Sequence, residues 1–165
     1  MFEGIAARNF CAIERDDMYV TALVFCAETC VALADAERAA TLYQLLLRYA
    51  GQTANHPTAV CFGAADYYLA SLAETAHRPD IAGEHYERAL TLNRAMRAWP
   101  ALARTLSRYG AFLLSLATDA ERALGRQRLR EAGELARRLG MARLAADIDA
   151  SAGSRGIGDP ASTSG

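Results

Sequence analysis

Five residues in two stretches of the chain could together bind a peptide or a carboxylate. They are Tyr67, Ser71 and Glu74 in one stretch and Arg104 and Arg108 in another. Residues three and four apart lie on one face of a helix, and arginine can hold a carboxylate through two parallel hydrogen bonds. We predict a binding site on this concave face of a helical stack. The alternative is that Tyr68 belongs to the core and the five are ordinary surface.

Side chains that could hold a metal or act in catalysis are present but scattered. Cys26 and Cys30 are four residues apart, but no nearby His or Cys pair completes a set of four ligands. Both fall on an apolar stripe, which favours buried core thiols. His56, His77 and His85 have no nucleophile or second base beside them, which favours surface and capping roles. We therefore expect no enzyme activity, no metal and no cofactor.

The charged residues exclude two kinds of chemistry. All 18 basic residues are arginine, whereas a Walker A loop needs a lysine at the phosphates and a Schiff-base enzyme needs a lysine amine. The net charge of −1 gives no overall attraction to nucleic acid or to an anionic membrane. Seven arginines crowd residues 122–143 and alternate with glutamates, which is typical of a solvated helix face. We expect no direct contact with nucleic acid.

The composition indicates helices throughout. The chain is 52% hydrophobic, alanine supplies much of this, and alanine, leucine and arginine favour helix. No run alternates between apolar and polar residues, so strands are not expected. A loop is predicted over residues 52–56. Caps, prolines and apolar stripes predict helices over residues 17–33, 35–50, 57–76, 79–97, 100–113, 119–139 and 141–150.

A pattern of small, large and small residues recurs in every second helix. The step between corresponding positions is 43 residues, which lies in the range of helical-hairpin repeats. Small side chains let a neighbouring helix approach closely, and the large residue fills the space between them. We call these positions the seams; they are Ala39, Tyr43 and Leu46, then Ala82, Tyr86 and Ala89, then Gly125, Leu129 and Ala132.

Three stretches resemble the helical-repeat region of large bacterial LuxR-type regulators that carry an AAA-like ATPase, and of relatives fused to a nucleotide cyclase. They are DAERAATLYQLLLRYAGQ (Asp35–Gln52), HYERALTLNRAM (His85–Met96) and LREAGELARRLGM (Leu129–Met141). The resemblance covers roughly residues 17–144. It implies a repeat lobe that senses or docks regulators, here detached from the ATPase.

We therefore predict an all-α fold: a short, tetratricopeptide-like α-α solenoid of about three helical hairpins. A partial N-terminal segment (1–15) precedes the repeat domain (16–150), and a disordered tail (151–165) follows it. The expected function is a non-enzymatic protein-interaction or sensor module whose partner is a protein, possibly an ATPase or a regulator domain. The alternative is a receptor that binds a small-molecule inducer on the concave face. We expect a cytoplasmic protein that does not bind membranes.

The N-terminal end is the expected site of self-association. Phe2, Ile5 and Phe10 have no preceding hairpin to cover them, and the end units of short repeat arrays are exposed.

Overall fold

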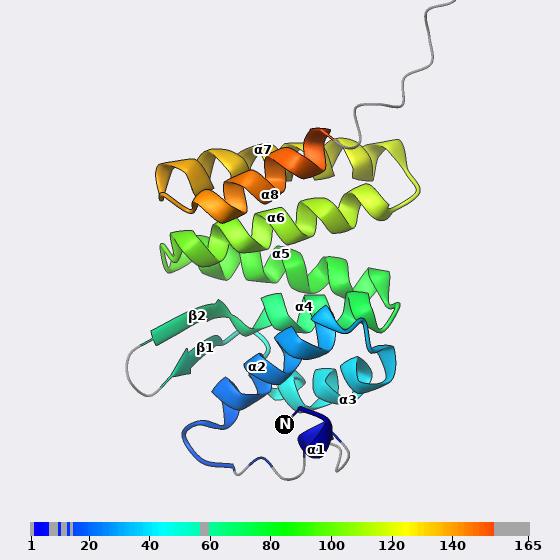
Figure 1. The fold of residues 1–165 in the computed structure, drawn as a ribbon, viewed down its shortest axis with the longest axis vertical. Coiled ribbons are helices and arrows are strands. Elements are labelled where there is room, and N and C mark those ends of the chain that lie inside the picture. The colour runs from blue at the N-terminus through cyan, green and yellow to red at the C-terminus, as the bar shows by residue number, and fades with distance from the viewer. Residues whose placement is uncertain (1, 7–9, 11–12, 14, 57–59, 154–165) are drawn as a thin grey trace, which may run out of the picture. The chain divides into compact units, whose positions relative to one another are not determined.

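The computed structural model describes residues 2–6, 10, 13, 15–56 and 60–153 of the chain, and the side chains of residues 2, 5, 56, 60, 152 and 153 are outside this description. This part is mostly helical, with neighbouring helices packed in sequence and one small hairpin of strands (Figure 1). The elements are α1 (Phe2–Ala6), α2 (Tyr19–Ala32), α3 (Ala36–Leu46), a 3-10 helix (Leu47–Tyr49), β1 (Thr53–His56), β2 (Val60–Ala64), α4 (Ala65–Thr75), α5 (Pro79–Ala95), α6 (Trp99–Ser115), α7 (Asp119–Arg138) and α8 (Ala142–Gly153).

The chain forms two compact units. The first is Met1–Thr105 and the second is Leu106–Gly165, so the division falls inside α6. In the first unit, α2, α3, α4 and α5 pack in chain order. In the second unit, α7 packs against α8.

Capping residues begin two of the helices much as the sequence predicts. The Asp35 carboxylate accepts a hydrogen bond from the Arg38 backbone N–H at 3.0 Å, which satisfies a donor at the start of α3. At the start of α7 the cap is Thr118 rather than the predicted Asp119. Thr118 and Glu121 form a reciprocal capping box. The seven predicted helices are all present, and the main change is where the third begins.

The prediction of an all-α fold is wrong between residues 52 and 64. The predicted loop at 52–56 contains β1, which pairs antiparallel with β2, and the third helix begins at Ala65 instead of Pro57. Pro57 itself lies outside the described residues. Gly63 has a φ of +92°, which an α-helix cannot contain. Cys61 lies on β2 and is exposed.

A buried side chain on α5 holds the end of β2 in place. The Asn93 side-chain oxygen accepts from the Ala64 N–H at 3.0 Å, and its nitrogen donates to the Thr105 hydroxyl at 3.1 Å. Beside it, a Cβ on Gly63 would lie 2.6 Å from the Ala101 Cβ. The hydrogen bond from Ala64 to Asn93 and the close approach of Gly63 to Ala101 both involve residues far away in sequence. The local sequence pattern therefore predicts the wrong structure here.

All three seams are buried, as the sequence predicts. Those on α3 and α5 lie in the core of the first unit, and the one on α7 lies in the core of the second. On α7 the small residue Gly125 lets two helix backbones approach, because it packs directly against the backbone of Gly110 on α6. Leu33, at which the first predicted helix ends, is 58% exposed.

The two ends of the chain differ from expectation in detail. Phe10 is 1% exposed, whereas the side chains of Phe2 and Ile5 lie outside the described residues. Glu3 on α1 accepts two hydrogen bonds from the guanidinium of Arg38 on α3, both at 2.8 Å. At the other end, residues 151–153 belong to α8 rather than to a tail, and residues 154–165 lie outside the description.

No helix in the described part of the chain combines the length and the apolar character needed to cross a bilayer.

Two glycine-to-alanine substitutions should change stability in opposite directions. In Gly125→Ala, the new Cβ would lie 2.8 Å from the Gly110 carbonyl oxygen, so α6 and α7 must separate at a cost of about 2 kcal/mol. In Gly83→Ala, the new Cβ on α5 meets nothing within 4 Å, so the better helix former should stabilise by about 0.5–1 kcal/mol. Urea unfolding followed by circular dichroism measures the free energy of unfolding of both variants. A change in the same direction for both would contradict the close approach of α6 and α7.

Candidate functional site

Two of the five predicted binding residues meet at one place in the first unit. The Arg104 guanidinium, from the start of α6, lies 5.2 Å from the centre of the Tyr67 ring on α4. It also donates to the Glu28 carboxylate on α2 at 2.7 Å. Three helices therefore contribute to one charged and aromatic group of side chains. Glu28 is the member that the sequence did not reveal.

The arginine in this group keeps its charge although it is partly buried. Burial opposes the charged form, but the neighbouring Tyr67 and Tyr68 and the hydrogen bond to Glu28 outweigh it and raise the pKa of Arg104. Burial also raises the pKa of Tyr68, which keeps its hydroxyl protonated to donate to the Phe62 carbonyl oxygen at 3.3 Å. The predicted core position of Tyr68 is confirmed, since it is 1% exposed.

An exposed aromatic ring lies one helical turn from Glu28 of this ion pair. Phe25 lies three residues before Glu28 on α2 and is 54% exposed. Its ring meets the edge of the Phe62 ring on β2, with centroids 5.7 Å apart. We call Phe25, Glu28, Phe62, Tyr67 and Arg104 the aromatic–arginine surface. A phenylalanine outside the apolar stripe of its helix was the one sequence signal for it.

Two of the other three predicted residues, Ser71 and Glu74, have partners elsewhere within the first unit. The Ser71 hydroxyl donates to the Tyr67 carbonyl of its own helix at 3.0 Å and is buried. Glu74 accepts a hydrogen bond from the Tyr86 hydroxyl at 2.7 Å, so it supports the α5 seam. Arg108 belongs to the second unit. Ser71 and Glu74 therefore use their polar atoms within the fold.

A buried cluster of three side chains lies in the core of the first unit. His85 on α5 contacts the Asp66 carboxylate through Nδ1 at 2.7 Å and the Tyr43 hydroxyl through Nε2 at 3.0 Å. The second Asp66 oxygen accepts from the Gly51 N–H at 2.6 Å. The cluster thus joins α3, α4, α5 and the turn before β1. The expected surface role of His85 is wrong.

The hydrogen bonds of this cluster resemble those of a catalytic proton relay, but the cluster is buried and a substrate cannot reach it. A carboxylate can only accept, so Nδ1 carries the proton towards Asp66, and in a neutral imidazole Nε2 would accept from the Tyr43 hydroxyl. His85 is 3% exposed and Asp66 is fully buried. The Arg78 guanidinium lies 5.2 Å from the centre of the Tyr43 ring. A substrate has no open approach to these atoms, so the cluster positions helices.

The carboxylate of the cluster is held in its ionised form. Burial by itself would raise the pKa of Asp66, but the hydrogen bonds from His85 and Gly51 outweigh burial, and the pKa lies below its ordinary value. Sequence reasoning missed the cluster because 42 residues separate Tyr43 from His85 and 19 separate Asp66 from His85.

The cysteines at helical spacing are part of the core, as predicted. Cys26 and Cys30 are both buried, and the Cys30 thiol donates to the Asp35 carbonyl oxygen at 3.2 Å. Burial, with a smaller contribution from Asp35, raises the pKa of Cys30 to about 11. Within the described ranges, no three His, Cys, Asp or Glu side chains gather closely enough to hold a metal ion.

Asp66→Asn should destabilise the chain at neutral pH more than in acid. Loss of buried hydrogen bonds to an ionised carboxylate should cost about 2 kcal/mol at pH 7. Since the folded pKa lies below the unfolded value of 3.8, the stabilisation is complete above this value and is lost as the pH falls below it. The wild type and variant should therefore converge in acid.

Urea unfolding at neutral pH and at progressively lower pH measures this difference. The exposed Asp17→Asn is the matched control and should have little effect at any pH. If the free energy of unfolding of Asp66→Asn stays below that of the wild type by a constant amount down to strongly acidic pH, Asp66 is not ionised in the folded chain.

Comparisons with known proteins give this chain no relative. No protein-family model matches it, and no curated protein or solved structure is significantly similar. The resemblance to ATPase-coupled regulators therefore depends on the three quoted stretches alone, and function must be argued from the geometry.

Proposed function

We propose that the chain is a non-enzymatic protein-interaction or sensor module. In this proposal it is a tetratricopeptide-like repeat lobe that works with an ATPase-coupled transcriptional or signalling regulator in the cytoplasm. The recurrence of buried seams with a 43-residue step supports the repeat. The observation that carries the function is the exposed Phe25 beside the Arg104–Glu28 ion pair.

The aromatic–arginine surface has the composition of a protein-binding site. Aromatic residues and arginine supply a large share of the energy at the centres of protein interfaces. Phe25 and Phe62 offer an apolar contact, and covering the half-exposed Phe25 ring would remove apolar area from water. A partner segment with an apolar residue next to a polar or acidic one fits this combination.

The ion pair leaves both of its members accessible to a partner. The Arg104 and Glu28 side chains remain 38% and 44% exposed while in contact. An arginine fork has five donors, and the 2.7 Å hydrogen bond to Glu28 uses one of them, which leaves others that a carboxylate could use. The stack of the guanidinium on Tyr67 holds the fork in one orientation, which reduces the entropy lost on binding.

The buried cluster supports a role without catalysis. The side chains whose hydrogen bonds most resemble an active site are Asp66, His85 and Tyr43. These hydrogen bonds join helices in the core. Self-association through the N-terminal end is a separate proposal. It has less apolar surface to use than the sequence indicates, since Phe10 is buried.

Binding to a partner should depend on the aromatic–arginine surface. We would measure binding of the full chain to separately expressed ATPase segments from the same genome by biolayer interferometry. Phe25→Ala and Arg104→Gln should each weaken binding by about tenfold, or roughly 1.4 kcal/mol. Leu47→Ala, a change at an exposed apolar residue outside this surface, is the matched control and should bind as the wild type does.

Two outcomes would contradict the proposal. If the wild type binds no ATPase segment at high concentration, the link to such regulators fails. If Leu47→Ala weakens binding as much as Phe25→Ala, the binding surface lies elsewhere. A thermal-shift screen with small molecules tests the alternative of an inducer receptor, which would require Tyr67 or Arg104 for any stabilisation.

A further inference from the structure

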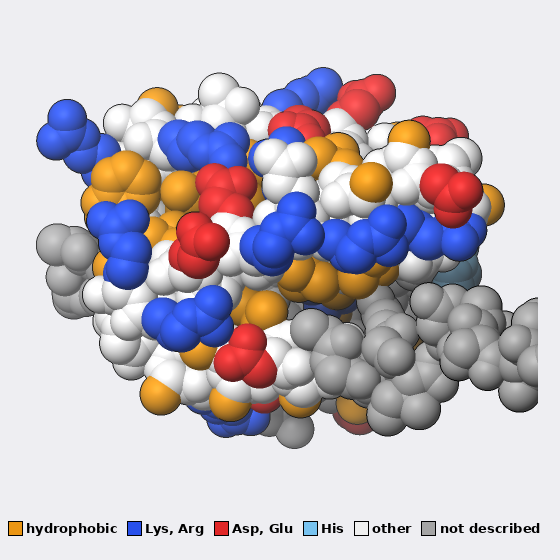
Figure 2. Space-filling model, turned by 90° about the horizontal axis from the view of Figure 1, so that it is seen from above, with side chains coloured by type: hydrophobic (Ala, Val, Ile, Leu, Met, Phe, Trp, Pro, Cys, Tyr) orange, Lys and Arg blue, Asp and Glu red, His pale blue; other side chains and the backbone are white. Residues whose placement is uncertain are grey.

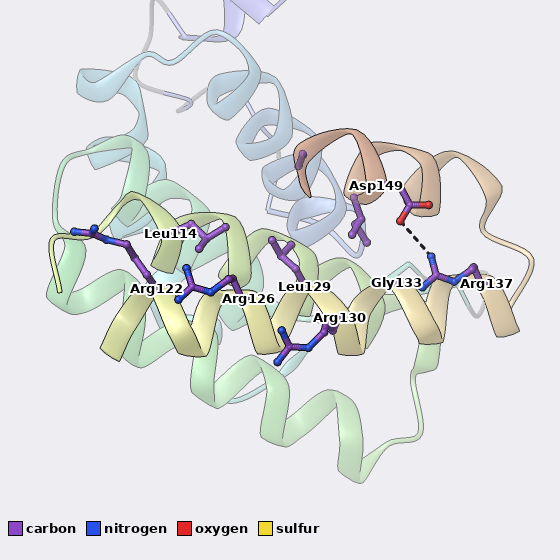
Figure 3. Close-up of a pocket in the computed structure, with 10 residues that line it drawn as sticks. Leu114, Arg122, Arg126, Leu129, Arg130, Gly133, Arg137 and Asp149 are labelled. Atoms are coloured by element: carbon purple, nitrogen blue, oxygen red, sulfur yellow. Dashed lines mark hydrogen bonds and ion pairs between the residues drawn. The ribbon is translucent and has the colours of Figure 1, made fainter. Parts of the chain in front are cut away.

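A pocket with an apolar floor lies within the second unit. Its volume is about 550 Å³, within the range of small-molecule sites. Leu114 from α6, Leu129 from α7 and Ile148 from α8 contribute apolar side chains to its lining. Residues from all three helices of this unit therefore meet around one hollow (Figure 3).

Arginines from a single helix form the rim of this pocket. Arg122, Arg126 and Arg130 follow one another along α7 at intervals of four residues, and Arg137 lies further along the same helix (Figure 3). Gly133 also lines the pocket, and the Arg137 guanidinium lies over it, with one nitrogen 3.3 Å from where a Cβ would stand. Figure 2, which views the molecule from the side of α7 and α8, shows basic side chains in a row beside hydrophobic surface.

The arginines at the two ends of the row already have partners. Arg122 donates to the carbonyl oxygens of Leu116 and Ala117, which close the turn before α7. Arg137 donates to the Asp149 carboxylate on α8 at 3.3 Å, and Asp149 is the acidic residue in the pocket lining. These contacts fix the ends of the rim.

The two arginines in the middle of the row are different. Arg126 and Arg130 make no hydrogen bond or ion pair with any part of the chain that the structure describes. They lie one helical turn apart, so their side chains emerge about 6 Å from each other. Two neighbouring guanidiniums over an apolar floor repel each other, and an anion between them would remove that repulsion.

We propose that this pocket binds a small amphipathic anion with one carboxylate or phosphate group and an apolar body. The anionic group lies between Arg126 and Arg130, where guanidinium forks can hold its oxygens. The apolar body covers Leu114, Leu129 and Ile148 and excludes water from them. This site is independent of the aromatic–arginine surface, because it lies in the other unit.

The shape and lining favour this ligand over a nucleic acid. A surface that binds single-stranded nucleic acid combines phosphate contacts with aromatic side chains on which the bases stack. The described residues that line this pocket include no aromatic side chain. Asp149 would also repel a polyanion at one end of the row. A single charge with an apolar body meets neither difficulty.

Isothermal titration calorimetry with decanoate and decyl phosphate tests the proposal. Both should bind the full chain. Butyrate has less apolar surface, so its affinity should be at least about tenfold lower. Decyltrimethylammonium has the same chain length and the opposite charge, and it should not bind. Failure of both ten-carbon anions to bind the wild type at millimolar concentration would overturn the proposal.

Variants on α7 locate the anionic group. The double change Arg126→Gln with Arg130→Gln should weaken decanoate binding by about tenfold or more. Arg138→Gln removes an exposed charge from the same helix outside the pocket lining, and it should leave binding unchanged. Circular dichroism checks that each variant is folded. Equal weakening by Arg138→Gln would mean general attraction of anions and would overturn the site.

Two further measurements separate other occupants of the row. Vesicles containing phosphatidylglycerol test a membrane surface, and an acidic amphipathic peptide tests a protein segment. We expect neither to compete with decanoate. Binding of vesicles or peptide by a chain that fails to bind free decanoate would assign the arginine row to that partner and would overturn the small-molecule pocket.

Discussion

The first unit depends on the hydrogen bonds that His85 makes to Asp66 and Tyr43. Side-chain contacts within one helical hairpin are local, but this cluster joins three helices and the turn that leads into the strands. Its cost is the burial of a carboxylate, which the hydrogen bonds from His85 and from the Gly51 N–H must offset. Because a histidine has only two ring nitrogens, and both are used, the helices can satisfy the cluster in one relative position. The polar cluster therefore selects that position, while the seams around it supply apolar contact.

The fold was predictable where the deciding forces are local. Helix starts at Asp35 and near Thr118 follow from short polar side chains that satisfy backbone donors, and these signals lie within a few residues. The seams follow from helical periodicity. The strands were not predictable, because Ala64 is held by Asn93 from a helix that begins 15 residues later in the chain. Tertiary contact there overrides a short run with no strand pattern of its own.

The candidate sites show the same division. Tyr67 and Arg104 were placed on one face by reasoning about hairpins, and they do meet, but Ser71 and Glu74 satisfy partners within the fold. His85 carried no signal, because a lone histidine in an amphipathic helix has the same sequence appearance whether it is surface or core. The sequence predicted that the arginines of α7 form a charged helix face. That four of them border an apolar hollow depends on how α6 and α8 pack against α7 within the second unit.

The buried Asn93 has a consequence for the order in which the first unit folds. The strands β1 and β2 have four and five residues, and an isolated two-stranded hairpin of this size is marginal in water. Its last strand is held by an amide that also needs Thr105 from α6. The hairpin therefore gains its anchor only after α5 and the start of α6 have come together. We therefore expect the hairpin to form late, and any loosening between those two helices should release it first.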